Sequence, residues 1–392
     1  MGDDPGHVPH PFRQFILKVH SRCDLACDYC FVYTKEDQRW VDRPPTMTRS
    51  TIDTIGQRIA EHVRAHHLAS VSVVLHGGEP LLAGIDRIAY YVETIRAVVD
   101  ATVTVRFALQ TNGVLLTPAG LAALRQLGVR VGVSLDGDRV ANDRHRRRRD
   151  GRSSYSHVAA ALHELARPEN RDIYSGIICA VDLANDPVAT YEALIRYLPP
   201  LIDFLLPLGN WTNPPPGRLE NLSATPYSDW LIAVFDRWYD APFRETGVRY
   251  FEDVINVLLG GRATTVGVGL APVAAIVVET DGAMEVCDGL TGTFLGAAVT
   301  GLSVADSTFD EALAVPLVIE RQGGVRVLAP ACQSCELLHV CGGGVHAQRY
   351  RAGNGFQNPS VYCPDLFALI AHIRGRLATD LAGLRSVSDS LL

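Results

Sequence analysis

The amino-acid sequence predicts an α/β fold in which six parallel strands and six helices form a partial, TIM-like (β/α)6 barrel. Short β-rich runs alternate with stretches of helical apolar spacing from residue 12 to about residue 240. This alternation requires right-handed parallel crossovers, which excludes an antiparallel sheet. The chain has 392 residues, of which 47% are hydrophobic and 20% charged, so it is globular and has room for a second, smaller domain.

The β-rich runs give six expected strands, at residues 15–19, 71–75, 103–109, 129–134, 176–181 and 202–206. The helical patterns give six expected helices, at residues 50–66, 85–99, 118–127, 154–165, 187–197 and 226–239. Ser50, Thr117 and Thr225 are the expected N-caps, and a proline follows each of the last two. In such a barrel, functional groups gather at the carboxyl ends of the strands.

The strand and helix alternation is expected to stop near Val248, so we place a domain boundary near Gly247. Residues 12–247 form the predicted barrel domain. Residues 248–392 contain an apolar strand pattern around 273–286, four cysteines between residues 332 and 363, and a C-terminal helix. We expect this second domain to be cysteine-rich and small.

Charge and composition exclude several classes of protein. The net charge of −7 speaks against nucleic-acid binding, and the basic run at 144–149 is expected to be a solvated face apart from Arg146. The most apolar stretch, 266–278, is shorter than the ~20 residues of a membrane helix. Residues 1–6 carry no targeting signal, so a cytoplasmic protein is expected. Only two lysines, Lys18 and Lys35, are present, which disfavours Schiff-base chemistry.

Nine cysteines in a chain without a secretory signal are expected to be metal ligands or catalytic groups rather than disulfides. Cys23, Cys27 and Cys30 have the spacing Cys-x3-Cys-x2-Cys directly after the first strand. Three thiolates hold three irons of a 4Fe-4S cluster and leave the fourth iron open, which implies chemistry at that iron. The alternatives are a zinc site that lacks its fourth ligand, or unrelated core cysteines.

This cysteine loop resembles that of the radical S-adenosylmethionine (SAM) enzymes, including Tyr29 just before the last cysteine. Gly77-Gly78-Glu79-Pro80 follows the second strand and is similar to the GGEP motif of that family. The resemblance implies that SAM chelates the open iron of a 4Fe-4S cluster and that one electron cleaves it to a 5'-deoxyadenosyl radical. It also implies that the GGEP residues bind the methionyl ammonium.

Two further strand ends match positions where the family contacts SAM or substrate, and their candidate residues are Asn112, Ser134 and Asp136. The segment from Ser134 to Arg146 has the length of a family segment whose last arginine pairs with the SAM carboxylate. Arg146 is therefore the candidate, and Arg144 and Arg147 are the competing assignments.

Three other residues near these strand ends are ambiguous. His20 and His76 either line the pocket or are structural histidines, and Cys179 is expected to be a buried thiol inside the fifth strand.

A second cysteine group consists of Cys332, Cys335, Cys341 and Cys363. It resembles the SPASM domain, in which four cysteines hold an auxiliary 4Fe-4S cluster without an open iron. The implied role is electron relay, or stapling of a small domain. A structural zinc held by the same thiolates is the alternative.

The full SPASM pattern has seven cysteines and two auxiliary clusters, and this sequence departs from it. Cys287 matches one ligand of the other site, but Val345 stands where another is expected, and no cysteine lies between Cys179 and Cys287. We therefore expect one auxiliary cluster, with Cys287 either a free thiol or a remaining ligand of the lost site. Asp288 lines up with the proton-accepting aspartate of anaerobic sulfatase-maturating enzymes, which makes it the candidate base. An ordinary solvated turn aspartate is the alternative.

Within the family, the FxsB type of peptide maturase is the nearest resemblance. The matching pieces are spread over residues 15–23, 135–139, 142–146, 278–282, 341–344 and 355–363. The resemblance implies a carbon–carbon cyclophane cross-link between an aromatic ring carbon and the β-carbon of a residue two positions on in a ribosomally made precursor peptide. Alternatives are thioether formation, epimerisation or formylglycine formation, a non-catalytic iron-sulfur scaffold, and a zinc-binding regulatory protein.

The partners implied are a precursor peptide and an external electron donor such as flavodoxin or ferredoxin. About fifteen residues precede the first strand, too few for a built-in leader-recognition domain. Leader binding is therefore expected to use the C-terminal region or a separate leader-recognition protein, or to have little affinity. The sequence gives no sign of the cross-linked residues, the number of rings or the oligomeric state.

Overall fold

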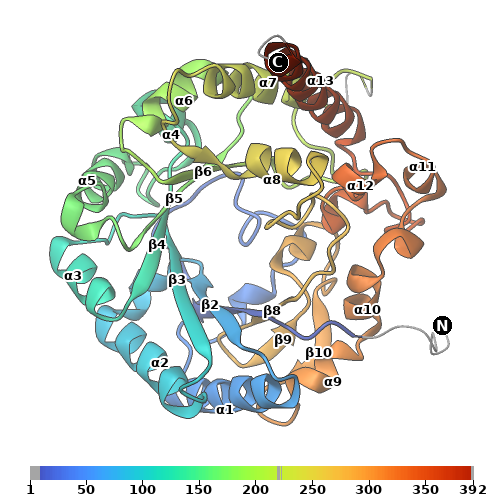
Figure 1. The fold of residues 1–392 in the computed structure, drawn as a ribbon. Coiled ribbons are helices and arrows are strands. Elements are labelled where there is room, and N and C mark those ends of the chain that lie inside the picture. The colour runs from blue at the N-terminus through green and yellow to red at the C-terminus, as the bar shows by residue number, and fades with distance from the viewer. Residues whose placement is uncertain (1–8, 219–220, 222, 390–392) are drawn as a thin grey trace.

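The computed structural model describes residues 9–218, 221 and 223–389. Its centre is one sheet of ten strands, in the order β10-β9-β8-β1-β2-β3-β4-β5-β6-β7, which curves into a partial barrel (Figure 1). The strands are β1 (Gln14–His20), β2 (Ser70–Gly77), β3 (Thr104–Thr111), β4 (Val129–Ser134), β5 (Tyr174–Ala180), β6 (Leu201–Leu205), β7 (Gly247–Val248), β8 (Ala275–Val278), β9 (Ala283–Glu285) and β10 (Val299–Ser303). The N-terminal residues 1–6, which were expected to carry no signal, lie outside the described residues.

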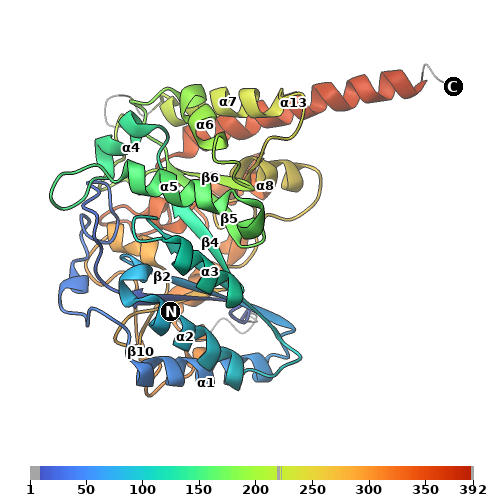
Figure 2. The same ribbon diagram turned by 90° about the vertical axis from the view of Figure 1, so that its left-hand side faces the viewer.

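Helices cover the outside of this sheet (Figure 1). The barrel segment has α1 (Arg49–Ala65), α2 (Ile85–Val98), α3 (Pro118–Gln126), α4 (Arg139–His145), α5 (Tyr155–Leu165), α6 (Pro187–Ile195), α7 (Pro226–Tyr239) and α8 (Arg249–Leu258). The C-terminal segment adds α9 (Phe309–Leu313), α10 (Pro316–Gln322), α11 (Pro330–Gln333), α12 (Leu338–Cys341) and α13 (Cys363–Asp389). Figure 2 shows α13 extending beyond the body of the protein.

The six predicted strands and six predicted helices are all confirmed, with ends that differ by a few residues. Strands β1 to β7 pair in parallel, as the crossovers require. Alternate residues of β2 are buried, and their apolar side chains belong to the continuous core of the barrel. The α/β barrel expected from the sequence is therefore the observed fold.

One of the three expected N-caps, Ser50, is wrong, and another, Thr225, lies at the expected position without a capping hydrogen bond. Helix α1 is capped by Thr48, whose side chain accepts a hydrogen bond from the Thr51 amide, because Thr48 is the last residue with extended backbone; Ser50 already lies inside the helix. Thr117 caps α3 as expected. Thr225 occupies the N-cap position of α7, but its hydroxyl donates to Asp229 instead of accepting from the backbone.

The expectation that the strand and helix alternation stops near Val248 was wrong. The two-residue strand β7 leads into α8, and β8 then pairs in parallel with the opposite edge at β1, from Gln14↔Ala275 to Leu17↔Val278. The predicted apolar pattern around 273–286 forms β8 and β9, which are antiparallel to each other. The C-terminal segment thus continues the sheet that the N-terminal segment begins.

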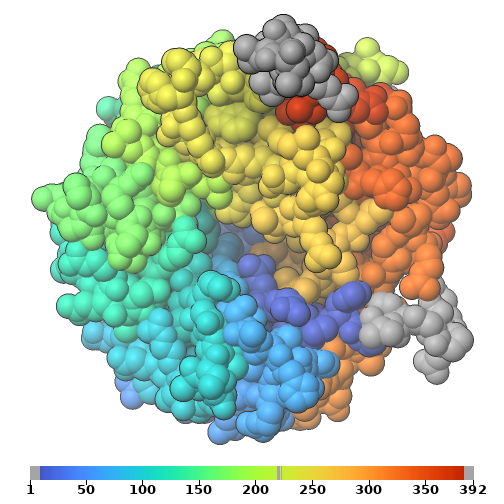
Figure 3. Space-filling model, viewed as in Figure 1, coloured from blue at the N-terminus to red at the C-terminus, as the bar shows by residue number. Residues whose placement is uncertain are grey.

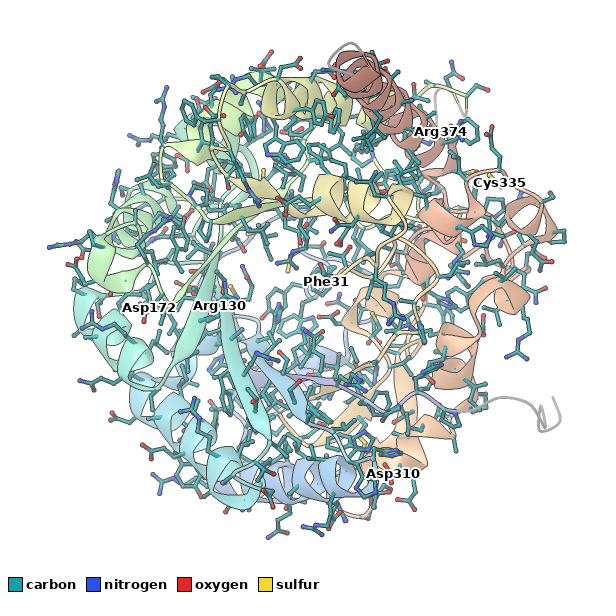
Figure 4. The ribbon with its side chains drawn as sticks, in the orientation of Figure 1. Phe31, Arg130, Asp172, Asp310, Cys335 and Arg374 are labelled. Atoms are coloured by element: carbon teal, nitrogen blue, oxygen red, sulfur yellow. The ribbon has the colours of Figure 1, made fainter. Side chains whose placement is uncertain are left out.

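A polar contact also joins the two segments on the outer layer. His62 and His66 of α1 contact the same oxygen of Asp310 in α9, at 2.5 and 3.0 Å (Asp310 is labelled in Figure 4). His62 is buried and packs edge-on against Phe15 and Phe309.

In the part of the chain that the structure describes, no helix is long and apolar enough to cross a membrane.

Candidate active site

The first cysteine group lies in the loop after β1, inside the ring of strands. Figure 4 labels Phe31, the residue after Cys30, near the centre of that ring. Figure 3 shows a hollow in the face turned to the viewer, while the dark blue loops after β1 lie toward the opposite face, at the left of Figure 2. The Ala26 amide donates to the Arg147 carbonyl at 2.8 Å, which fixes the loop to the segment after α4. All three thiols are partly exposed. Burial raises the pKa of the Cys23 thiol to about 12. Burial also raises the pKa of the Cys27 thiol, and the nearby Arg146 charge opposes this second shift.

The two glycines of the GGEP segment let the end of β2 pass directly against the cysteine loop. The Gly78 amide donates to the His20 carbonyl at 2.7 Å, and the Glu79 amide donates to the Arg22 carbonyl at 2.9 Å. A Cβ atom on Gly77 would lie 2.2 Å from the His20 carbonyl oxygen, and one on Gly78 would lie 1.8 Å from the Tyr33 hydroxyl. A side chain at either position is therefore incompatible with this packing.

Glu79 is completely buried, and its carboxylate joins the end of β2 to the end of β3. It accepts hydrogen bonds from the Leu81 amide (2.9 Å), the Thr111 hydroxyl (2.7 Å) and the Asn112 amide (2.8 Å). Burial raises the pKa of Glu79 to about 7 although these bonds oppose the shift. Pro80 begins the short 3-10 helix η2 (Pro80–Ala83).

The Asn112 side chain brings the end of β3 to the cysteine loop. Its amide nitrogen donates to Asp24 at 2.7 Å and lies 3.6 Å from the Cys23 sulfur. Ser134 at the end of β4 accepts from the Gln110 side chain at 3.0 Å. Among the expected SAM contacts, Asn112 is therefore in direct contact with the cluster loop, whereas the hydroxyl of Ser134 is bonded to a neighbouring strand.

Tyr29, Asp136 and Arg146 form one chain of hydrogen bonds, in which Asp136 and Arg146 are buried and Tyr29 is half-buried. The Tyr29 hydroxyl donates to Asp136, and Arg146 donates to the Tyr29 oxygen at 2.9 Å. The Ala180 amide holds the other Asp136 oxygen at 3.0 Å. The Nε of Arg146 is buried and has no hydrogen-bond partner among the described residues. A buried guanidinium donor without a partner points to an acceptor from outside the protein, such as a carboxylate.

The competing arginines are already occupied. Arg144 is partly exposed and pairs with Asp182 at 2.9 Å, and Arg147 donates to the Asp143 carbonyl at 2.5 Å. Of the three candidates, Arg146 is thus the one whose guanidinium is buried beside a cluster cysteine. Most of the run at 144–149 is solvated, as expected, while Arg146 is only 8% exposed.

A pocket lies between β1, the GGEP segment and the short 3-10 helix η4 (Asp288–Gly292), and Lys18, Phe31, Gly78 and Asp288 line it. Lys18 Nζ lies 2.8 Å from Asp288 Oδ2 and 3.3 Å from His76 Nδ1. Although burial works in the other direction, the Lys18 charge lowers the pKa of Asp288 to about 2. Lys18 and Phe31 were not expected at the site from the sequence. The one available signal for Lys18 is that a lysine stands inside an otherwise apolar strand.

The remaining ambiguous residues are resolved by their surroundings. Cys179 is fully buried in β5, as expected. His20 lines the pocket, and its ring is also hydrogen-bonded to the backbone of Arg22. His76 is half-buried beside Lys18, and desolvation lowers its pKa to about 4. Cys287 precedes Asp288 and is partly exposed.

The second cysteine group is assembled from α11, the loop that follows it, the last residue of α12 and the first residue of α13. Burial raises the pKa of Cys341 to about 11, and the charges of Cys363, Cys332 and Cys335 add to this shift, so the four sulfurs share one region. Figure 4 labels Cys335 at the periphery, near Arg374 of α13 and away from Phe31. The two cysteine groups therefore lie in different parts of the structure, which fits the different roles expected for them.

Comparisons with known proteins agree with this geometry. The model of the Radical SAM superfamily matches residues 17–179. The chain is 24% identical over 361 residues to a cysteine-type anaerobic sulfatase-maturating enzyme of Clostridium perfringens, covering 90% of this chain and 94% of that protein. It is also 24% identical to a serine-type anaerobic sulfatase-maturating enzyme of Klebsiella aerogenes, over 88% of this chain and 82% of the relative.

Solved structures share the fold. Native anSMEcpe with bound AdoMet superposes with a TM-score of 0.79 at 22% identity and covers 93% of this chain and 98% of its own. Streptococcus suis SuiB bound to the precursor peptide SuiA gives a TM-score of 0.58 at 13% identity, over 90% of this chain and 76% of its own. The barrel, the three-cysteine loop and the superfamily match together make this chain a radical SAM enzyme. Its cofactors are SAM and a SAM-binding 4Fe-4S cluster.

Proposed function

We propose that this enzyme modifies a side chain of a ribosomally made peptide. The observation that supports this proposal best is the pocket beside Gly78, whose wall includes the Lys18–Asp288 ion pair and the Phe31 ring. One side of the pocket is thus the segment expected to hold SAM, and the other side is a charged and aromatic surface on which a peptide side chain would lie. The names of the relatives, which mature sulfatases, and the peptide-bound structures of anSMEcpe and SuiB support a peptide substrate.

In the proposed SAM site, Cys23, Cys27 and Cys30 hold the cluster. The unpartnered Arg146 Nε is the donor for the SAM carboxylate, while Tyr29 and Asp136 fix the guanidinium. The segment Gly77–Pro80, together with Asn112, Ser134 and Asp136, completes the binding surface for SAM.

When bound, SAM and its cluster supply a 5'-deoxyadenosyl radical, and an auxiliary cluster supplies a one-electron acceptor. The residues of this chain then orient the peptide and remove a proton. Asp288 is the proposed base: the Lys18 charge keeps it ionised, and it lines the pocket wall. Lys18 positions that carboxylate through the ion pair at 2.8 Å.

The proposed auxiliary cluster is held by Cys332, Cys335, Cys341 and Cys363. Their mutual electrostatic effects and the buried cations around them fit four thiolates on one cluster. We propose one auxiliary cluster rather than two, because Val345 replaces a ligand of the second and Cys287 has no cysteine partner between it and Cys179. The proposed domains are residues 12–247 for the SAM chemistry and 248–392 for the auxiliary cluster.

The finer proposal is a cyclophane cross-link, in which a β-carbon radical adds to a nearby aromatic ring and the adduct loses an electron and a proton. Ring closure needs one electron acceptor and one base, which are the roles given to the auxiliary cluster and Asp288. Formylglycine formation is the second candidate, because it is favoured by the names of the sulfatase-maturating relatives. An external donor such as flavodoxin or ferredoxin, a separate leader-recognition protein and a cytoplasmic location complete the proposal.

Two synthetic peptides separate the candidates. One carries an aromatic residue followed two positions later by an aliphatic residue, and the other carries a single serine or cysteine in an aliphatic context. Cyclophane formation removes two hydrogens from the first peptide and blocks fragmentation between the linked residues in tandem mass spectrometry. Formylglycine in the second peptide instead reacts with a hydrazide. A hydrazide-reactive product together with an unchanged first peptide would replace the cyclophane proposal with the second candidate.

A further inference from the structure

Arg349 is a buried arginine, and two of its three guanidinium nitrogens have no hydrogen-bond partner among the described residues. It is 7% exposed and ends the short 3-10 helix η6 (His346–Arg349). Its Nε and Nη1 atoms are both buried without a hydrogen-bond partner among the described residues. Its remaining nitrogen, Nη2, lies 3.3 Å from His346 Nδ1. A guanidinium in this state is costly unless an acceptor from outside the protein completes it.

The charges around Arg349 indicate where that acceptor lies. Burial lowers the pKa of Arg349, and the strongest opposing charge is that of Cys332, followed by Glu320. Cys341 also attracts it. Glu320 does not pair with Arg349, since its carboxylate instead lies 3.8 Å from His346 Nε2. As thiolates, Cys332 and Cys341 thus attract this cation together with Glu320, whereas Arg321 repels it.

A second buried arginine provides a contrast. Arg218 is fully buried and its charge acts on Cys363, so it also borders the cysteine group. However, Arg218 lies 3.4 Å from the carboxylate of Asp365, and its Nε donates to the Val361 carbonyl at 3.0 Å. One nitrogen of Arg218, Nη2, is also buried without a hydrogen-bond partner among the described residues. Arg218 nevertheless has an ion-pair partner in Asp365, whereas the described part of the chain offers none to Arg349.

We propose that Arg349 is the positioning and charge-compensating residue of the auxiliary cluster, with Nε and Nη1 donating to the cluster or its thiolates. This inference rests on the proposed auxiliary cluster. A cluster with four thiolate ligands is anionic and gains a further negative charge when it is reduced. A fixed buried cation and its hydrogen bonds stabilise the reduced form, and therefore raise the reduction potential. Arg349 would make this cluster a better acceptor for the electron released during ring closure.

The test measures the midpoint potential of the auxiliary cluster by an anaerobic redox titration followed by electron paramagnetic resonance. A full-length Cys23/Cys27/Cys30→Ala background leaves this cluster as the source of the signal. Arg349→Gln is expected to shift the midpoint to a more negative potential. Arg349→Lys keeps the charge but loses the planar pair of donors, so a smaller shift is expected.

Arg374→Gln is the matched control. Arg374 lies near Cys335 in Figure 4, but its side chain is 45% exposed and pairs with Glu336, so water screens its charge. We expect the wild-type midpoint in this variant. The inference is overturned if Arg349→Gln retains about four irons and the wild-type midpoint. It is equally overturned if Arg374→Gln causes the same shift, because the effect would then not be specific to the buried cation.

Iron counting distinguishes this failure from failure of the proposed function. If the background protein binds zinc but no iron at its four C-terminal cysteines, there is no auxiliary cluster, and both proposals fall. If Arg349→Gln loses its iron while Arg349→Lys retains about four irons, a positive charge at this position is required to hold the cluster, as the proposed role predicts. If both variants lose their iron although each melts at the wild-type temperature, the positive charge of residue 349 is not what holds the cluster, and the proposed role is contradicted.

Discussion

Lys18 Nζ in β1 lies 2.8 Å from Asp288 Oδ2 at the start of η4, so an ion pair joins two positions that are 270 residues apart. Lys18 is 4% exposed, and its ammonium also lies 5.6 Å from the centre of the Phe31 ring. This contact connects the strand that precedes the first cysteine group to the C-terminal segment. It also places the candidate base on the wall of the pocket next to the GGEP glycines.

Lys18→Met is expected to destabilise the protein by about 2 kcal/mol, because it leaves the Asp288 carboxylate, which is only 24% exposed, without its cation. Adding Asp288→Asn to this variant removes the uncompensated charge and should recover much of the loss. Thermal unfolding of the two single variants and the double variant measures the coupling. Purely additive losses would show that the ion pair contributes nothing to stability.

Asp288→Asn tests the role of the base. The substitution keeps the shape of the side chain but removes the proton acceptor, so formation of the peptide product should fall by about 100-fold or more. Formation of 5'-deoxyadenosine should persist, because it does not need this proton transfer. Simultaneous chromatography of both products gives the answer. Wild-type yields of modified peptide would exclude Asp288 as the base.

Arg146→Lys is expected to weaken SAM binding at least tenfold, because lysine loses the planar donors that match a carboxylate. Arg144→Lys is the matched control, since Arg144 is partly exposed and pairs with Asp182. Equilibrium binding of SAM to the anaerobic, cluster-loaded proteins compares the two. A larger loss in the Arg144 variant would move the carboxylate contact to that residue.

Gly78→Ala should disrupt the first cluster. The new methyl group would meet the Tyr33 hydroxyl at 1.8 Å and the Arg22 carbonyl oxygen at 2.4 Å, so the cysteine loop must move. We expect a loss of about four irons per chain. Gly375→Ala in α13 is the control, since a Cβ there meets nothing within 4 Å. Full iron content in the Gly78 variant would contradict the close packing of β2 against this loop.

Glu279 predicts a pH dependence of stability. Burial raises its pKa from 4.5 to about 7, although the charges of Lys18 and Arg43 oppose the shift. The folded protein therefore holds this proton more tightly than the unfolded chain, and the free energy of unfolding decreases as the pH rises from about 4.5 to about 7. Asp288, with its lowered pKa of about 2, acts in the opposite direction and only at lower pH.

Glu279→Gln should therefore reduce the slope of melting temperature against pH between pH 4.5 and 7. The slope should not vanish, because the pKa of buried Glu79 is also raised to about 7. Glu336→Gln, at a side chain that is 60% exposed, serves as the control. Identical slopes for wild type and Glu279→Gln would contradict the assignment of a raised pKa to Glu279.

The sequence predicted the barrel because its strands are continuous apolar runs and its helices have one apolar face. It missed the strand β7, because two residues carry too little pattern to be recognised as a strand, and with it the crossover through α8 to β8. It also missed that β8 completes the sheet beside β1, since pairing between residues as distant as Phe15 and Ile276 leaves no local signal.

Parts of the candidate site were also beyond prediction from sequence. Cysteine spacing separated the two groups, and segment length singled out Arg146. The ion pair between Lys18 and Asp288 depends on the fold, as does the unpartnered state of Arg349. Both features arise from which side chains are buried together, and neither has a characteristic spacing along the chain.

The most direct test of a radical SAM enzyme with one auxiliary cluster is anaerobic reconstitution, followed by iron counting and a SAM cleavage assay. Wild type should hold about eight irons and release 5'-deoxyadenosine in the presence of dithionite. The Cys23/Cys27/Cys30→Ala variant should hold about four irons and release none. About twelve irons in wild type would mean a second auxiliary cluster, and a fully loaded protein that forms no 5'-deoxyadenosine would contradict the central claim.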